Sequence, residues 1–252
     1  MHGHPKENEP ATRRWAIADP GNRREVLLLA LALVVVLLTW SFAELADEVA
    51  EGDAHRTDEA LLLALRSAAD LADPIGPKWL EELARDFTAL GGVGVLTAMT
   101  LAVAGFLALQ GKRHAAVYVL LAVGTGLLAA MLLKGGYSRP RPALVPHASY
   151  TYTSSFPSGH AMMSAVVYLT LGALLARFQP SLRLRLYLLG VAVVLSLLVG
   201  VTRVYLGVHW PTDVLAGWLA GAAWASLCWL TALLLQRQGR VESEPEDGLA
   251  PP

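Results

Sequence analysis

The stretch Arg203-Val-Tyr-Leu-Gly-Val-His209-Trp-Pro-Thr-Asp213 separates two long apolar runs, residues 186–202 and 214–236. Each run approaches the length of about 20 residues that a helix needs to cross the hydrocarbon core of a bilayer. A cation, an imidazole and a carboxylate therefore lie together at the junction of two predicted membrane helices. Ionisable groups are costly inside a membrane, so this junction is a candidate functional site.

The residues around Pro211 predict a defined geometry for His209 and Asp213. Proline suits the first position of a helix, because its missing N–H would have no partner there. Asp213 then lies in the first turn and can accept a hydrogen bond from one ring nitrogen of His209, leaving the other free as a nucleophile or base. In the alternative interpretation, Asp213 only complements the helix N-terminus and His209 is an interfacial histidine.

The composition is that of a membrane protein. Of the 252 residues, 54% are hydrophobic and 16% are charged, whereas soluble domains contain about 25% charged residues. The net charge of −1, without a basic run, argues against a nucleic-acid partner. The only cysteine, Cys228, excludes an intrachain disulfide.

Charge-free runs predict an all-α fold, a six-span transmembrane helical bundle with an outer amphipathic helical loop. The spans are predicted at residues 26–43, 87–110, 114–133, 159–177, 186–203 and 212–236. Residues 1–25 are predicted to be a flexible cytoplasmic arm, residues 26–236 the membrane domain and residues 237–252 a disordered cytoplasmic tail. Gly217-x-x-x-Gly221 in the last span predicts close helix packing.

The distribution of Lys and Arg predicts the orientation, because cytoplasmic loops are enriched in these residues. With a cytoplasmic N-terminus, more than half of the Lys and Arg residues fall on the cytoplasmic side. We therefore expect a multi-pass protein of the cell (inner) membrane with both termini in the cytoplasm. A cleaved signal peptide in the first span is the alternative, disfavoured by the long polar segment before it and by the poor cleavage site at residues 42–46.

The first external loop, about residues 44–86, leads into an amphipathic helical pattern. Trp79, Leu80, Leu83 and Phe87 fall on one helical face, opposite charged residues. Two arrangements are open: a helix lying along the outer membrane surface, or a solvated helix packed on the bundle.

The third span ends in Lys134-Gly-Gly-Tyr-Ser-Arg139-Pro-Arg141-Pro142. Three cations this close repel one another unless an anion joins them, which predicts a phosphate clamp. Positive flanking of a span is the alternative, but that rule favours the cytoplasmic side and this end is predicted to be external.

The stretch Ser154-Ser-Phe-Pro-Ser158-Gly159-His160 stands immediately before the fourth span. Free backbone N–H groups and the helix dipole at such a start favour an anion. The Ser158 hydroxyl would add a hydrogen bond, and His160 could protonate a leaving oxygen. An ordinary serine cap would explain Ser158 but not the histidine. The predicted topology puts all three stretches on the external side, where they can converge on one anion.

Together these stretches resemble the three-part signature of the phosphatidic acid phosphatase type 2 superfamily, which also includes vanadium haloperoxidases and glucose-6-phosphatase. The matching residues are Lys134 and Arg141-Pro142, then Pro157-Ser158-Gly159-His160, then Arg203, His209 and Asp213. Thr202 stands where the family usually has serine. The family spacing selects Arg141 over Arg139 as the clamp residue and leaves the role of Arg139 open.

The resemblance implies catalysis through a phosphohistidine. His209 would attack phosphorus, Asp213 would orient it, and His160 would protonate the leaving group and then activate water. The residues that would hold the phosphate oxygens are Lys134, Arg141, Ser158, Gly159 and Arg203. This scheme needs no cofactor and no metal, and the motifs contain no carboxylate cluster for magnesium.

A site at the outer end of a membrane bundle favours a lipid phosphate that enters from the bilayer. The candidates are undecaprenyl diphosphate, phosphatidylglycerol phosphate and phosphatidic acid, which the sequence does not rank. Three alternatives stay open: a non-catalytic lipid-phosphate carrier or flippase, a phosphatase for soluble phosphate esters and, less favoured, a vanadate-dependent peroxidase. The sequence also leaves the oligomeric state open.

Overall fold

The computed structural model of the chain describes residues 20–143 and 154–237. Within these ranges every regular element is a helix, and an isolated β-bridge joins Arg66 to Pro74, so the all-α prediction is confirmed. The helices are α1 (Pro20–Glu51), α2 (His55–Leu63), α3 (Lys78–Ala89), α4 (Val93–Leu109), α5 (Arg113–Gly136), α6 (Gly159–Arg177), α7 (Leu182–Tyr205) and α8 (Pro211–Arg237). Residues 1–19 of the predicted arm and 238–252 of the predicted tail lie outside the described residues.

Helix α1 extends beyond the predicted first span at both ends. It begins at Pro20, a residue that favours the first position of a helix, so residues 20–25 are helical and not part of a flexible arm. At the other end it continues through a polar, helix-forming segment to Glu51. It stops where Gly52 adopts a φ of 89°, a conformation open to glycine at little steric cost.

Five helices have the length and composition to cross a membrane in the part of the chain that the structure describes: α1, α5, α6, α7 and α8. Helices α3 and α4 pass the same test as a pair bent by 47°, which brings the number to six. The break falls at Gly91-Gly92, and small-residue pairs are a known cause of kinks. The predicted span 87–110 is therefore not one straight helix, because residues 87–89 belong to α3 and α4 covers only Val93–Leu109.

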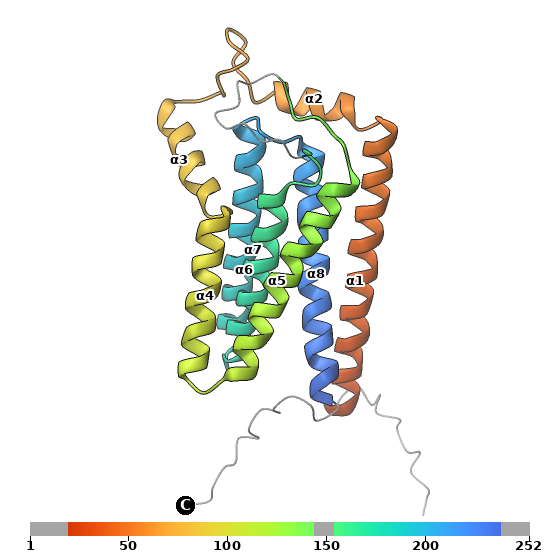
Figure 1. The fold of residues 1–252 in the computed structure, drawn as a ribbon, viewed down its shortest axis with the longest axis vertical. Helices are drawn as coiled ribbons and strands as arrows, with labels where there is room; N and C mark the ends of the chain where they lie inside the picture. Colours follow the sequence, from red (N-terminus) through yellow and green to blue (C-terminus); the bar gives the residue numbers. More distant parts are fainter. Residues whose placement is uncertain (1–19, 144–153, 238–252) are drawn as a thin grey trace, which may run out of the picture.

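Helix α6 lies at the centre of the bundle, against α7 and α8, while α1 packs on the outside of α8 (Figure 1). The burial of the spans follows this arrangement: 72% of the apolar window of α6 is buried, against none of that of α1. Val166 of α6 is fully buried, as are Val119 of α5 and Val199 of α7. Helix α6 is therefore the scaffold of the bundle, and its N-terminus is the part most firmly held.

Helix α8 approaches α6 closely through the predicted glycine pair. A Cβ on Gly217 would lie 2.7 Å from the Ser158 carbonyl oxygen, and one on Gly221 would overlap the Met162 carbonyl oxygen. Because these positions carry no side chain, the two backbones can touch, as the small-residue spacing predicts. The Ser158 N–H then donates to the Asp213 carbonyl oxygen at 2.9 Å, which joins the starts of α6 and α8.

Two shorter helices belong to the end of the bundle where α5 ends and α6 begins (Figure 1). Helix α2 lies across this end and contacts α8, and α3 packs against α7. Trp79 and Leu83 of α3 stay exposed while Ala84 is buried. Helix α3 thus packs on the bundle, as in the second predicted arrangement, and also presents an apolar strip outward, as the first arrangement requires.

Candidate active site

The three motif stretches meet at one end of the bundle (Figure 1). Lys134 lies in the last turn of α5, His160 in the first turn of α6 and Arg203 in the last turn of α7. Asp213 lies in the first turn of α8, and His209 lies in the short connection before it. Each residue thus stands where an apolar helix meets a polar connection, which is why distant parts of the sequence share one site.

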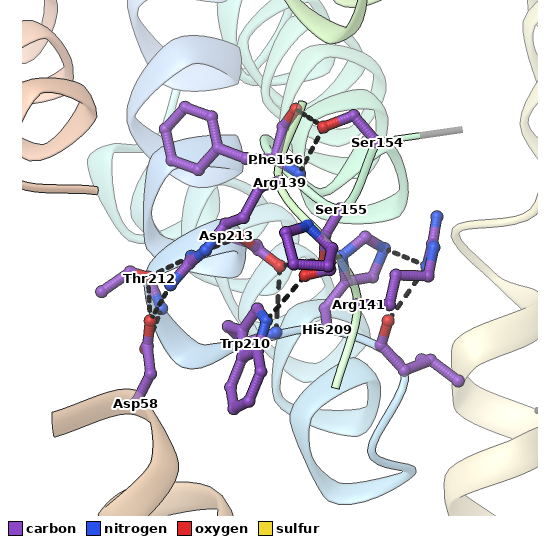
Figure 2. A network of polar contacts seen from close by, with 12 residues as sticks. Asp58, Arg139, Arg141, Ser154, Ser155, Phe156, His209, Trp210, Thr212 and Asp213 are labelled. Carbon is purple, nitrogen blue, oxygen red and sulfur yellow. Dashed lines mark hydrogen bonds and ion pairs between the residues drawn. The ribbon is translucent and has the colours of Figure 1, made fainter. Parts of the chain in front are cut away.

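His209 and Asp213 form the predicted pair (Figure 2). The His209 Nδ1 lies 3.3 Å from Asp213 Oδ2, and both side chains are buried, with exposed fractions of 2% and 0%. The same Oδ2 accepts from the Trp210 N–H at 3.0 Å, so Asp213 also caps the start of α8. The interpretation of His209 as an interfacial histidine is therefore wrong.

The other ring nitrogen of His209 faces the cations. Its Nε2 lies 3.2 Å from Arg141 Nη1. Burial lowers the pKa of His209 from 6.5 to about 4, and the hydrogen bond with Asp213 opposes this shift only in part. At neutral pH the ring is therefore uncharged. With Nδ1–H directed to the carboxylate, Nε2 carries the lone pair of the neutral ring, which here accepts from Arg141 and is the one that can act as a nucleophile.

Ser155 completes the Nδ1 side of the imidazole. Its hydroxyl makes a short hydrogen bond to Asp213 Oδ2 and lies 3.3 Å from His209 Nδ1. Its own N–H donates to the Arg139 carbonyl oxygen at 2.9 Å, which ties the two motif-bearing segments together. The aspartate is thus held by several donors at once, and the ring plane of His209 is fixed.

The start of α6 presents an open polar surface. Ser158 is the N-cap residue, yet its hydroxyl makes no capping hydrogen bond. Within the described residues, the buried Ser158 Oγ has no hydrogen-bond partner, so the ordinary-cap interpretation is wrong. A Cβ on Gly159 would lie 3.2 Å from Lys134 Cε, so the glycine leaves room for the lysine beside the helix start.

Three cations surround the same space. Lys134 Nζ donates to the Ser154 carbonyl oxygen at 3.1 Å, and Arg141 Nη1 donates to that of Val208 at 2.9 Å. Arg203 Nη1 donates to a hydroxyl of α3 at 3.2 Å. In the described part of the chain, the buried Nε atoms of Arg141 and Arg203 have no hydrogen-bond partner. Donors remain free on both guanidinium groups.

Three positively charged side chains lie close enough to His160 to act on its ring. The positive charges of Arg203, Lys134 and Arg141 all act on its ring, and so does His209. Burial also lowers the pKa of Arg141, with Asp213 opposing. Several partly desolvated cations around two histidines are the arrangement expected for an anion of high charge density.

Arg139 is separate from these cations, although it stands two residues from Arg141. Its Nη1 donates to Asp213 Oδ1 at 2.7 Å and its Nη2 to Asp58 Oδ2 at 2.5 Å (Figure 2). Both of its partners are carboxylates, and both are fully buried. The question left open by the sequence is thereby answered: Arg139 holds acidic side chains and is not part of the cation cluster.

Four residues of the site were not predicted. Ser155 lies inside a motif stretch and Thr212 lies next to Asp213, so proximity in the sequence could have pointed to them. Thr88 of α3 contacts Arg203, and Asp58 comes from α2. Asp58 stands in the polar loop region predicted at residues 44–86, where no signal in the sequence separates it from its neighbours. Thr88 stands at the start of the span predicted at residues 87–110, where a single threonine gives no signal of a site.

The described residues contain no group of three or more His, Cys, Asp or Glu side chains able to hold a metal ion. The acidic side chains nearest the imidazole, Asp213 and Asp58, are instead engaged by Arg139.

Comparisons with known proteins agree with this geometry. The PAP2 superfamily model matches residues 115–237, which include the three motif stretches. Phosphatidylglycerophosphatase B of Bacillus subtilis (strain 168) is 36% identical over 148 residues, covering 57% of this chain and 70% of that protein. A lipid A 1-phosphatase of Rhizobium johnstonii is 36% identical over 135 residues, covering 50% of each protein.

The fold is also similar to a solved structure. The crystal structure of a transmembrane PAP2-type phosphatidylglycerolphosphate phosphatase from Bacillus subtilis superposes with a TM-score of 0.69 at 28% sequence identity. The similarity covers 84% of this chain and 98% of that one.

Proposed function

Since this chain belongs to the PAP2 superfamily, we propose that it hydrolyses the phosphate or diphosphate head group of a membrane lipid through a phosphohistidine at His209. The family expected from the three motifs is confirmed, and the apolar helices together with membrane relatives establish a multi-pass membrane protein. The relatives support a lipid phosphatase as the class of enzyme.

The observation that supports this proposal most directly is the asymmetry around His209. Its Nδ1 side is held by Asp213 and Ser155, whereas its Nε2 side faces buried donors. Within the described residues, the donors without a hydrogen-bond partner include Arg141 Nε, Arg203 Nε and Ser158 Oγ. Buried polar atoms are rarely left unpaired, so these three fit the oxygens of a bound phosphate.

In the first step, Nε2 of His209 forms a bond to phosphorus and the bond from phosphorus to the leaving oxygen breaks. His160, protonated when the anionic head group offsets the cations around it, donates a proton to that oxygen, which leaves as the lipid alcohol or lipid phosphate. Asp213 stabilises the positive charge on the phosphorylated imidazole. The cations and the start of α6 stabilise the charge on the equatorial oxygens of the transferred group.

In the second step, water attacks the phosphorus of the phosphohistidine. His160 now accepts a proton from that water, and the phosphorus–nitrogen bond breaks. Inorganic phosphate leaves, and His209 returns to its neutral form with Nδ1–H directed to Asp213. Each proton and each bond is supplied by the substrate, water or the two histidines, so we propose that the reaction needs no metal.

The position of the site at the end of the spans suits a lipid whose chains stay in the bilayer. We place this end on the external side of the cell membrane, with both termini in the cytoplasm, on the distribution of Lys and Arg. Phosphatidylglycerol phosphate is the first substrate to test, because a relative of that activity shares 36% identity over 70% of its length. Undecaprenyl diphosphate and phosphatidic acid follow.

The test is phosphate release by the purified full chain in detergent, with EDTA present, for wild type and His209→Ala. Wild type should release phosphate from at least one of the three lipids despite the chelator, and His209→Ala should release none. His114→Ala, at the opposite end of α5, is the matched histidine control and should retain activity. Rapid denaturation during turnover of a ³²P-labelled lipid should trap an acid-labile phosphate on wild type and none on His209→Ala.

The same assays separate the alternatives. A well-folded wild type that binds the lipids but releases no phosphate would contradict hydrolysis and favour a carrier or flippase. Equal rates on a short-chain and a long-chain phosphate would contradict the lipid substrate and favour a phosphatase for soluble esters.

A further inference from the structure

A buried carboxylate of the outer loop, Asp58, takes part in the polar network around Asp213 (Figure 2). Asp58 lies on α2 with an exposed fraction of 0%. Its Oδ1 accepts from the Thr212 N–H at 2.9 Å, and its Oδ2 accepts from Thr212 Oγ1 and from Arg139 Nη2 at 2.5 Å each. A helix outside the candidate spans therefore reaches the first turn of α8.

Arg139 connects this carboxylate to that of the catalytic pair. One edge of its guanidinium binds Asp58, and Nη1 binds both Asp213 Oδ1 and Thr212 Oγ1 at 2.7 Å. The remaining oxygen of Asp213, Oδ2, is left for His209, Ser155 and the Trp210 N–H. One cation thus bridges two buried anions, and only one of these anions touches the imidazole.

The net charge of this network stabilises the positively charged form of the His209 ring. Two carboxylates and one guanidinium carry one net negative charge beside Nδ1. Without Asp58, Arg139 and Asp213 would be a neutral pair, and the imidazolium formed on phosphorylation would lose its counter-charge. Charge interactions of this kind are strong at buried sites, because water screens them poorly.

Helix α2 is also held in place by a second contact. The His55 ring meets the Trp210 ring edge-on, with 5.3 Å between the centroids. Trp210 in turn donates from Nε1 to the Pro140 carbonyl oxygen at 3.0 Å. The loop that follows α1 is thereby fixed against the same segment that carries His209.

On these grounds, and resting on the proposed phosphatase function, we propose that Asp58 is a positioning residue for catalysis. It holds Arg139 so that Asp213 keeps both its orientation and its negative charge for His209. Asp58 does not touch the phosphate, so it should affect the rate of the chemical steps and not the binding of the lipid.

The test compares Asp58→Asn with wild type, with Glu59→Gln as the matched control. Asn keeps the shape and one acceptor but removes the charge. Loss of a charge-assisted hydrogen bond predicts kcat roughly tenfold lower, with KM unchanged. Glu59 is the next residue of α2 and is exposed, so Glu59→Gln should leave kcat unchanged. Equal kcat for Asp58→Asn and wild type would overturn the proposal.

The double variant Asp58→Asn/Arg139→Gln tests whether Asp58 acts through Arg139. If it does, kcat of the double variant should be no lower than that of Arg139→Gln alone, because neighbouring residues of one network are not additive. If the fold-losses in kcat of the two single variants multiply in the double variant, the two residues act independently and the proposal is overturned.

Arg139→Lys gives a second route if Asp58→Asn does not fold. An ammonium keeps the charge but lacks the planar fork that bridges two carboxylates. It should lower kcat at unchanged KM, and an unchanged kcat would overturn the bridging role. Wild type without any phosphate release would overturn the proposed function itself, and with it the role of Asp58, whereas the other outcomes concern Asp58 alone.

Discussion

The two sides of the His209 ring differ in how completely their polar atoms are paired. On the Nδ1 side, Asp213 accepts from the ring, Ser155, Arg139 and the Trp210 N–H. On the Nε2 side, buried donors of two arginines and a serine lack partners among the described residues. The paired side holds the His209 ring in one geometry, and the unpaired side carries the donors that the proposed mechanism assigns to the phosphate. Substitutions on the Nδ1 side should lower both the stability of the protein and the rate of the reaction. Substitutions on the Nε2 side should lower the rate alone.

The largest effect is expected from Asp213→Asn. It removes the carboxylate that orients Nδ1–H, and such changes lower kcat by roughly a thousandfold or more. It also removes the charge that accepts hydrogen bonds from Arg139, Ser155 and the Trp210 N–H, and weakening such charge-assisted bonds should cost about 2 kcal/mol of stability. Kinetics and thermal unfolding in detergent would measure both. Asp47→Asn, an exposed position on α1, is the control. A variant with reduced kcat and unchanged Tm would break the proposed difference between the two sides.

Arg203→Ala should have the next largest effect, on the unpaired side. Loss of one charged donor to the transition state should lower kcat/KM roughly 10²- to 10³-fold. The Tm should stay unchanged, because the side chain has like-charged neighbours and one hydroxyl partner. Inorganic phosphate should raise the Tm of wild type and not that of the variant. Arg183→Ala, exposed near the other end of α7, is the matched control; a large fall in Tm for Arg203→Ala alone would argue against an unpaired side.

Ser155→Ala should have a smaller effect on the paired side. It removes one of several donors to Asp213, and loss of one hydrogen bond to a charged group predicts kcat lower by roughly tenfold. KM should not change, because Ser155 faces Nδ1 and not the phosphate space. Steady-state kinetics would measure this, with the exposed Ser181→Ala as control. A raised KM at constant kcat would assign Ser155 to substrate binding.

The smallest effect concerns pH. The folded protein holds the pKa of His209 at about 4 against 6.5 for the ordinary ring. Between these values an unfolded chain binds a proton that the folded chain does not, so this residue should make stability fall as pH decreases from 6.5 to about 4. The difference in Tm between wild type and His209→Ala should shrink over the same range. Protonation of His209 should limit the phosphorylation step only near pH 4. A limb near pH 6.5 that persists in single-turnover phosphorylation would contradict the lowered pKa.

Much of the fold could be predicted because the spans are long and free of charge. The limits of α5, α6 and α8 lie within three residues of the predicted spans. The meeting of the three motif stretches followed from topology, since helices that alternate in direction return their ends to the same side. Gly217-x-x-x-Gly221 predicted a close contact, because a missing side chain is visible in the sequence itself.

The remaining features of the fold and the site could not be predicted, because they depend on contacts between elements that are distant in the sequence. An aspartate in an acidic loop has no local feature that distinguishes Asp58 from its exposed neighbours. The family spacing selected Arg141 for the cation cluster but left Arg139 without a role, because its two carboxylate partners come from α2 and α8. The bend between α3 and α4 falls at Gly91-Gly92, where Gly91 closely approaches Val199 of α7. The glycines are visible in the sequence, but the charge-free run continues across them and so predicted one straight span.

The packing of α1 on α8 has a consequence for the order of events during biosynthesis. The first helix meets the last one, and Asp213 lies in the first turn of that last helix, with His209 just before it. Chains are made from the N-terminus, so α1 through α7 are synthesised before either contact can form. A nascent chain halted before α8 therefore contains His209 but not Asp213, and both the packing of α1 and the His209–Asp213 pair form only once the last helix has been made.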